Sequence, residues 1–136
     1  MINLSYLIDT NIFLEILLDQ EKSRECQDIL ERAGNGKIEC VVTHFTVHAI
    51  EGLLTDDLET VRKFVKNLEN SSGIKIVDTT LAEEREIASN AEDFGLDFDD
   101  SMQFSVARKQ GIEKIISLDK DFDKTSIERI EPSEII

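Results

Sequence analysis

The sequence predicts an α/β fold: a three-layer α/β/α sandwich around a central, mainly parallel sheet of four to five strands. The main observation is that short, apolar, β-branched runs alternate with longer segments whose apolar residues recur at helical spacing. Such alternation places helical crossovers on both faces of a parallel sheet. The second observation is that no repeat, low-complexity tract or linker interrupts the chain, so we expect one domain over residues 1–136.

Turn signals divide the first half of the chain into alternating elements. The pattern predicts strands at residues 4–8 and 38–43, and helices at residues 11–18, 23–33, 45–54 and 58–68. Gly34 is expected to end the second helix in the left-handed conformation.

The second half of the chain continues the alternation. We expect strands at residues 74–77 and 113–118, a short fifth strand at residues 126–130, and helices up to Phe94 and from the Asp99–Asp100 pair to Gln110. Thr80 and Glu83 form a capping-box pattern that opens the first of these two helices. Asp99 or Asp100 is expected to cap the second.

The chain is strongly acidic, with a formal net charge of −14 from 29 acidic and 15 basic residues. This charge argues against holding nucleic acid by phosphate neutralisation alone, and it leaves either a solvated acidic surface or carboxylates gathered around a divalent cation. From Ser101 onward the charge is nearly balanced, so the C-terminal third is the more plausible face for a polyanion.

Cys26 and Cys40 are the only cysteines, and their spacing and apolar flanks indicate buried thiols in a reducing compartment. No apolar run approaches membrane-spanning length, and no secretory signal pattern is present. We therefore expect a cytoplasmic protein without a membrane segment.

Acidic residues fall where the sheet should present a ligand site. Asp9 and Asp119 directly follow predicted strands, and ligands bind beyond the carboxyl ends of parallel strands. Glu51 lies on a helix that is apolar nearly all round, so it is either paired, bound to a cation or placed on a narrow polar stripe. Asp97, Asp99 and Asp100 begin a helix, where capping explains one or two of them.

Carboxylates from four separate segments suit Mg²⁺ or Mn²⁺, which take few carboxylates and fill their remaining positions with water and phosphate. Such a site can support phosphodiester hydrolysis, and its cation answers the charge objection to RNA binding. No EF-hand spacing is present.

Four motifs in order resemble the PIN-domain family over essentially the whole chain. They are Ile8-Asp9-Thr10-Asn11, Thr43 followed by Glu51, Asp100 followed by Ala107 on a helix, and Ser117-Leu118-Asp119-Lys120-Asp121-Phe122. The resemblance implies a Mg²⁺- or Mn²⁺-dependent endoribonuclease, and many members are VapC toxins that form homodimers and are silenced by an antitoxin protein.

The resemblance also implies roles for individual residues. Asp9, Glu51, Asp100 and Asp119 are expected as catalytic acids and metal ligands, directly or through water. Asn11 and Ser117 would support them by hydrogen bonds, with Asp97 and Asp121 as second-line candidates. The spacing to Glu51 is longer than the family pattern, so Thr46 competes with Thr43 in the alignment, and Asp99 competes with Asp100 as the third acid.

Other readings of the same residues stay open. His44 and His48 are one helical turn apart and Glu51 lies three residues further on, which could form a zinc site, although the HExxH protease motif is absent. The chain could also keep the PIN fold as a non-catalytic binding or regulatory protein, with Phe13 or Phe64 either in the core or on a partner surface.

Overall fold

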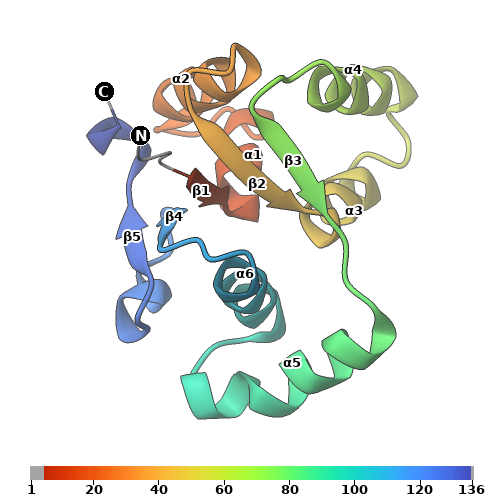
Figure 1. The fold of residues 1–136 in the computed structure, drawn as a ribbon. Coiled ribbons are helices and arrows are strands. Elements are labelled where there is room, and N and C mark those ends of the chain that lie inside the picture. The colour runs from red at the N-terminus through yellow and green to blue at the C-terminus, as the bar shows by residue number, and fades with distance from the viewer. Residues whose placement is uncertain (1–4, 136) are drawn as a thin grey trace.

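The computed structural model describes residues 5–135, in which strands and helices alternate along the chain (Figure 1). In order, the elements are β1 (Ser5–Ile8), α1 (Thr10–Leu17), α2 (Ser23–Gly34), β2 (Glu39–Thr43), α3 (His44–Leu53), α4 (Leu58–Glu69), β3 (Ile74–Val77), α5 (Leu81–Phe94), α6 (Phe98–Lys109), β4 (Lys114–Ile116), the 3₁₀ helix η1 (Lys120–Lys124), β5 (Glu128–Ile130) and the 3₁₀ helix η2 (Pro132–Glu134).

The five strands form one sheet in the order β3-β2-β1-β4-β5, and every neighbouring pair is parallel. β1 lies at the centre, where Leu7 pairs with Val41 of β2 on one side and with Ile115 of β4 on the other. The strand order reverses at β1, since the chain goes to β2 and β3 on one side and later to β4 and β5 on the other. The predicted three-layer α/β fold is confirmed.

Successive side chains of the strands fill two separate cores, as expected for a sheet covered on both faces. Ile8 and Val42 face α1, α2 and α3, whereas Leu7 and Val41 face α5 and α6. In Figure 1 the first four helices lie on one side of the sheet and α5 and α6 lie on the other. Phe13 is buried in the first core and Phe64 packs against it, so both belong to the core as the spacing favours.

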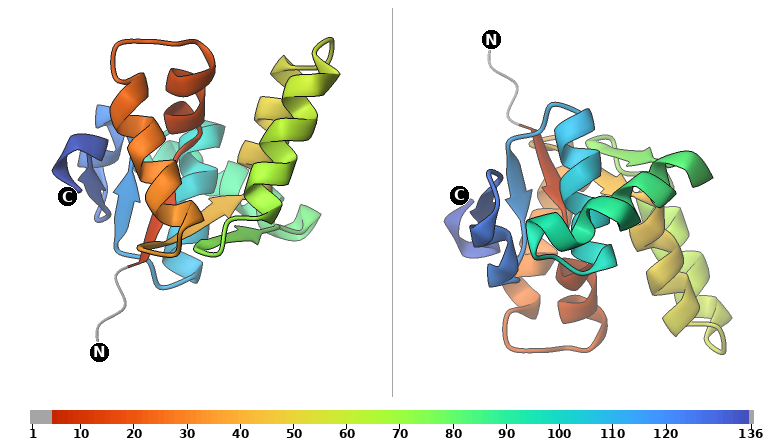
Figure 2. Two further views of the ribbon diagram at one scale, coloured as in Figure 1. Left: turned by 90° about the horizontal axis from the view of Figure 1, so that it is seen from above. Right: turned by 90° about the horizontal axis from the view of Figure 1, so that it is seen from below.

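On the first face, α4 stands apart from α1 and α2, which is visible in both views of Figure 2. The space between these helices is a groove of about 500 Å³ lined by apolar side chains such as Ile16, Leu30 and Leu68. None of the helices in residues 5–135 is long and apolar enough to cross a bilayer.

Two predictions about helix ends are wrong. Gly34 is the last residue of α2, and the left-handed residue is Gly36 with φ 74°, because the helix continues one residue further before the turn. The N-cap of α6 is Asp97, whose Oδ1 accepts a 2.8 Å hydrogen bond from the backbone N–H of Asp100. Asp99 and Asp100 therefore lie inside the first turn. The predicted start of β1 at Leu4 lies outside the described residues.

Candidate metal centre

The candidate site lies at the carboxyl edge of the sheet, next to the point where the strand order reverses. Asp9 follows the last residue of β1, and Ser117 and Asp119 follow the end of β4, its neighbour in the sheet. The N-terminal turn of α6 brings Asp100 to the same edge. The parallel pairing of β1 and β4 thus gathers residues that are about a hundred positions apart in the sequence.

Asp9 is almost completely buried, at 2% exposed, and its two oxygens have different partners. Oδ1 caps α1 by accepting the backbone N–H of Thr10 at 2.8 Å, and Oδ2 accepts the Ser117 hydroxyl at 2.7 Å. Asp9 therefore caps α1 and also lies at the edge of the sheet where a ligand would bind.

Ser117 joins the two strand ends. Its hydroxyl also accepts hydrogen bonds from the backbone N–H of Asp119 at 2.9 Å and from the Asn11 amide at 3.3 Å. Oδ1 of the Asn11 side chain accepts a hydrogen bond from the backbone N–H of Leu118 at 3.3 Å, which is a second contact between Asn11 and this loop. The predicted supporting residues Asn11 and Ser117 thus hold Asp9 and the loop that carries Asp119 in a fixed relation.

Three carboxylates gather beside this hydrogen-bonded group of residues. One oxygen from each of Asp100, Asp119 and Asp121 lies within 4.8 Å of the others. Asp100 is buried, whereas Asp121 is exposed and pairs with Lys124 at 3.3 Å. Asp119 caps η1 by accepting the Asp121 N–H at 2.9 Å. Asp97 is exposed and serves as the α6 cap, so it supports Asp100 through the backbone.

The carboxylates of the site repel one another, and this repulsion contributes to their raised pKa values. Burial raises the pKa of Asp9 to about 7 against the hydrogen bond from Ser117, and the charges of Asp99 and Asp119 raise it further. Burial also raises the pKa of Asp100, followed by its hydrogen bond and charge repulsion with Asp119 and by the charges of Asp97 and Asp9. Groups that resist ionisation in this way are stabilised by a nearby cation.

This donor set fits a hard divalent cation. Mg²⁺ and Mn²⁺ bind oxygen ligands, and a buried carboxylate beside two more exposed ones leaves room for water or phosphate on the open side. Repulsion among the acids is a second indication of a cation site, because a bound positive charge would relieve it. Asp9, Asp100, Asp119 and Asp121 are the residues that could hold such an ion.

Glu51, the fourth predicted acid, is placed elsewhere. Its Oε1 lies 2.8 Å from Nδ1 of the exposed His48, and Glu51 is not part of the carboxylate cluster. The His44 and His48 rings stack with centroids 4.1 Å apart, and His44 lies 3.7 Å from Asp78. Within residues 5–135, His44, His48 and Glu51 do not converge as three metal ligands.

Behind the acids lies a buried polar network that sequence reasoning missed. Gln103 is fully buried, and its amide contacts the hydroxyls of Thr10, Thr43 and Thr46 and the carboxylate of Asp99. The sequence carried one signal for it: Gln103 lies between the apolar residues Met102 and Phe104, and an amide buried there must find hydrogen-bond partners.

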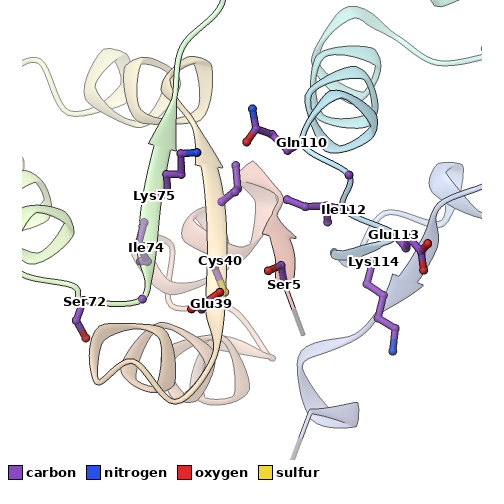
Figure 3. A pocket seen from close by; sticks show the side chains of 13 residues that line it. Ser5, Glu39, Cys40, Ser72, Ile74, Lys75, Gln110, Ile112, Glu113 and Lys114 are labelled. Atoms are coloured by element: carbon purple, nitrogen blue, oxygen red, sulfur yellow. The ribbon is translucent and has the colours of Figure 1, made fainter. Parts of the chain in front are cut away.

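A pocket of about 630 Å³ opens at the opposite edge of the sheet (Figure 3). Ser5, Glu39, Ile74 and Lys114, each the first residue of its strand, line this pocket, and Gln110 and Ile112 close it from the end of α6. Because ligands of doubly wound sheets bind beyond the carboxyl ends of the strands, the candidate site is the acidic edge and not this pocket.

Comparison with solved structures shows the same fold in bacterial toxins. A toxin–antitoxin complex from Klebsiella pneumoniae matches with a TM-score of 0.69 and 17% identity over 96% of this chain and 99% of that one. Mycobacterium tuberculosis VapC20, described as a toxin that cleaves the sarcin–ricin loop, matches with a TM-score of 0.71 and 15% identity over 93% and 99%. At these identities the likeness concerns the fold alone.

A third match comes from Neisseria gonorrhoeae, where the FitAcB structure gives a TM-score of 0.62 and 17% identity over 96% of this chain and 99% of that one. No curated protein sequence matches this chain. The PIN-domain family model matches residues 6–128, which include β1 with its Asp9, the start of α6 and the loop after β4. The chain therefore belongs to the PIN-domain family.

Proposed function

We propose that this protein is a Mg²⁺- or Mn²⁺-dependent endoribonuclease, with Asp9, Asp100 and Asp119 as its central acids. The observation that carries the proposal is the gathering of Asp100, Asp119 and Asp121 within 4.8 Å at the carboxyl edge of the sheet, beside the buried Asp9. Family membership supports the same reaction class, since PIN domains are typically nucleases.

The reaction is the hydrolysis of an RNA phosphodiester. A water oxygen adds to phosphorus, the bridging P–O bond breaks, and the proton lost by water ends on the departing oxygen. A divalent cation held by the acids would supply positive charge for the phosphate and make a nearby water more acidic. Asp100, Asp119 and Asp121 would hold the cation, and the buried Asp9 beside them would add a further negative charge to the site.

The supporting residues fix this geometry before substrate arrives. The Ser117 hydroxyl orients Asp9 and also accepts the backbone N–H of Asp119, so one side chain sets the relation between two acids. Asn11 holds the loop between them. A site that is already arranged loses little free energy by reorganising during the reaction.

RNA would approach from the side of η1. Lys120 and Lys124 flank Asp121 in this 3₁₀ helix and are exposed, whereas most of the net charge of −14 lies in the first hundred residues. The bound cation and these lysines then offset the acidic surface for a polyanion. A cytoplasmic toxin that forms a homodimer and is silenced by an antitoxin is the biological role that this activity fits.

The test is cleavage of labelled single-stranded and structured RNA in Mn²⁺, in Mg²⁺ and in chelator. Asp100→Asn keeps the side-chain shape and removes one charge from the site, and Asp28→Asn makes the same change on the exposed face of α2. We expect metal-dependent cleavage by the wild type and by Asp28→Asn, and at least a hundredfold loss, on the order of a catalytic acid's contribution, in Asp100→Asn.

Equal cleavage by the wild type and Asp100→Asn contradicts the proposal, because the activity then belongs to a contaminating nuclease or to other residues. A wild type that binds Mn²⁺ without cleaving any of these RNAs favours instead a PIN-fold protein that acts by binding.

A further inference from the structure

Two histidines lie side by side where β2 and β3 end, whereas the acidic centre lies where β1 and β4 end. The register of β2 and β3 pairs Thr43 with Val77, so the next residue of each segment, His44 or Asp78, reaches the same edge of the sheet. His48 follows one helical turn later on α3. Its ring stacks on that of His44 with centroids 4.1 Å apart and planes inclined by 19°.

Each imidazole faces a carboxylate through its Nδ1 atom. Nδ1 of His48 lies 2.8 Å from Oε1 of Glu51, and Nδ1 of His44 lies 3.7 Å from Oδ2 of Asp78. A carboxylate in this position favours the ring proton on Nδ1 and leaves the lone pair on Nε2. Within residues 5–135, neither Nε2 atom has a hydrogen-bond partner. The free donor atom of each ring is therefore one that a metal ion can bind.

Histidine ligands of metal ions usually have the partners that these two rings have. A metal-bound imidazole ordinarily donates its second N–H to a carboxylate, which fixes the orientation of the ring and makes the ligating nitrogen more basic. Glu51 would fill this role for His48, and Asp78 would fill it for His44. The two carboxylates therefore act behind the ligands, and their negative charges offset those of a divalent cation without reaching the ion themselves.

The two rings are close enough to share one ion. A tetrahedral cation that binds nitrogen at about 2.0–2.1 Å needs its two nitrogen ligands about 3.4 Å apart. The ring centroids are 4.1 Å apart, so binding requires the rings to turn until their Nε2 atoms approach each other. Both side chains can make this movement, because that of His44 is 38% exposed and that of His48 is 66% exposed. Water would complete the coordination.

We propose that His44 and His48 form a second metal site, which binds Zn²⁺. Imidazole nitrogen suits Zn²⁺, whereas Mg²⁺ and Mn²⁺ prefer the carboxylate oxygens of the acidic centre. The two sites use different faces of the fold, since Thr46 points into the buried network and His48 lies about 200° further around α3. They have no residue in common, so the zinc site is independent of the proposed ribonuclease activity.

Proton NMR of the imidazole rings during a titration with Zn²⁺ tests this site directly, because the chain has only two histidines. At about pH 7.5, where imidazole is ordinarily neutral, we expect the C–H signals of both rings to shift with one common affinity. Mg²⁺ is the control cation and should leave both signals in place, because it binds oxygen ligands.

Replacing either histidine should weaken binding at the other. His44→Asn and His48→Asn assign the two sets of signals, and each should lower the Zn²⁺ affinity of the remaining ring by at least about tenfold. The reason is that even a residue that only orients a ligand contributes about 10–100-fold. Both side chains are partly or largely exposed, so these variants keep the packing of α3.

Substitution of the carboxylates tests their role behind the rings. Glu51→Gln and Asp78→Asn each keep the side-chain shape and remove one charge, and each should weaken the Zn²⁺ response of the histidine signals by about tenfold. Glu92→Gln makes the same change on the exposed face of α5 and should retain wild-type affinity. Asp100→Asn should leave the response of the histidine signals to Zn²⁺ unchanged, because it alters only the acidic centre.

Histidine signals that do not respond to excess Zn²⁺ overturn the inference. A remaining ring that still responds with wild-type affinity in both histidine variants overturns it as well, because one imidazole then suffices. Neither result affects the proposed ribonuclease, which is tested separately by metal-dependent RNA cleavage in the wild type and in Asp100→Asn.

Discussion

Replacing Asp9 by asparagine should remove part of the pH dependence of the stability of the metal-free protein. Asp9 is 2% exposed, and burial is the main reason why its pKa is raised from its usual range to about 7. Asparagine preserves the side-chain shape and caps helices as well as aspartate does. The substitution therefore removes the titrating group with little change in packing.

The direction follows from the raised pKa. The native protein binds a proton that the unfolded chain releases, so the stabilising contribution is largest at low pH and is lost as the pH rises from about 4 through 7. The full shift corresponds to about 4 kcal/mol, and between about pH 5.5 and about pH 8 a single group of this kind changes the free energy of unfolding by about 2 kcal/mol.

The assay is urea-induced unfolding in chelator at these two pH values. Wild-type protein should be less stable at the higher pH, and the difference between the two values should be about 2 kcal/mol smaller in Asp9→Asn. Asp99 and Asp100 also have raised pKa values, so some dependence remains in the variant. Equal pH dependence in the wild type and the variant would refute the view that Asp9 is forced to ionise in a buried acidic site.

Two pairs of matched variants test the packing around the site and the sheet. Gly73→Ala should destabilise the protein by about 3 kcal/mol or more, because a Cβ there would lie 2.3 Å from the Ile38 carbonyl oxygen and 2.4 Å from that of Ala33. Gly52→Ala should instead raise the free energy of unfolding by about 0.5–1 kcal/mol, because Gly52 lies inside α3 with open space around it. Thermal unfolding measures both variants, and equal effects would contradict the close approach of the backbone at Gly73. Ser117→Ala should cost about 2 kcal/mol or more by leaving Asp9 and Asp119 without a shared partner, and Ser101→Ala, whose buried hydroxyl has no partner in residues 5–135, should be neutral within about 1 kcal/mol. A larger loss from Ser101→Ala would show that its hydroxyl has a partner after all.

Much of the fold could be predicted because local patterns and tertiary packing agree. The capping box of Thr80 and Glu83 opens α5 as expected, Gly95 ends the helix in the left-handed conformation, and β3 has the predicted bounds. Cys26 and Cys40 are both free and buried. Each of these features depends on residues that are close in sequence or on a single apolar face.

The errors arise where several similar residues compete for one position. Asp97, Asp99 and Asp100 are all suitable caps, and the turn geometry, which is absent from the sequence, selects Asp97. Gly34 and Gly36 compete in the same way at the end of α2. In both cases the residue that ends or caps the helix lies two or three positions from the predicted one, and the spacing of apolar residues does not resolve a difference of that size.

The candidate site could be predicted only as a set of acids. Strand ends locate Asp9 and Asp119 because parallel strands share an edge. Asp100 is preferred over Asp99 only through the PIN-domain resemblance, in which an alanine follows the third acid at the spacing of Ala107. The direction in which Glu51 points could not be predicted, because it depends on the rotation of α3 about its own axis. That rotation is set by the contacts of Thr46 with Thr10 and Gln103, which come from distant segments.

The most direct test of a metal site at this edge is anomalous diffraction from a crystal soaked in Mn²⁺. We expect the strongest manganese peak among the carboxylates of Asp9, Asp100 and Asp119, within coordination distance of at least two of them, at roughly 2.2 Å for a small hard cation. A strongest peak at the stacked His44 and His48 rings, or no peak at the acidic edge, would contradict the account.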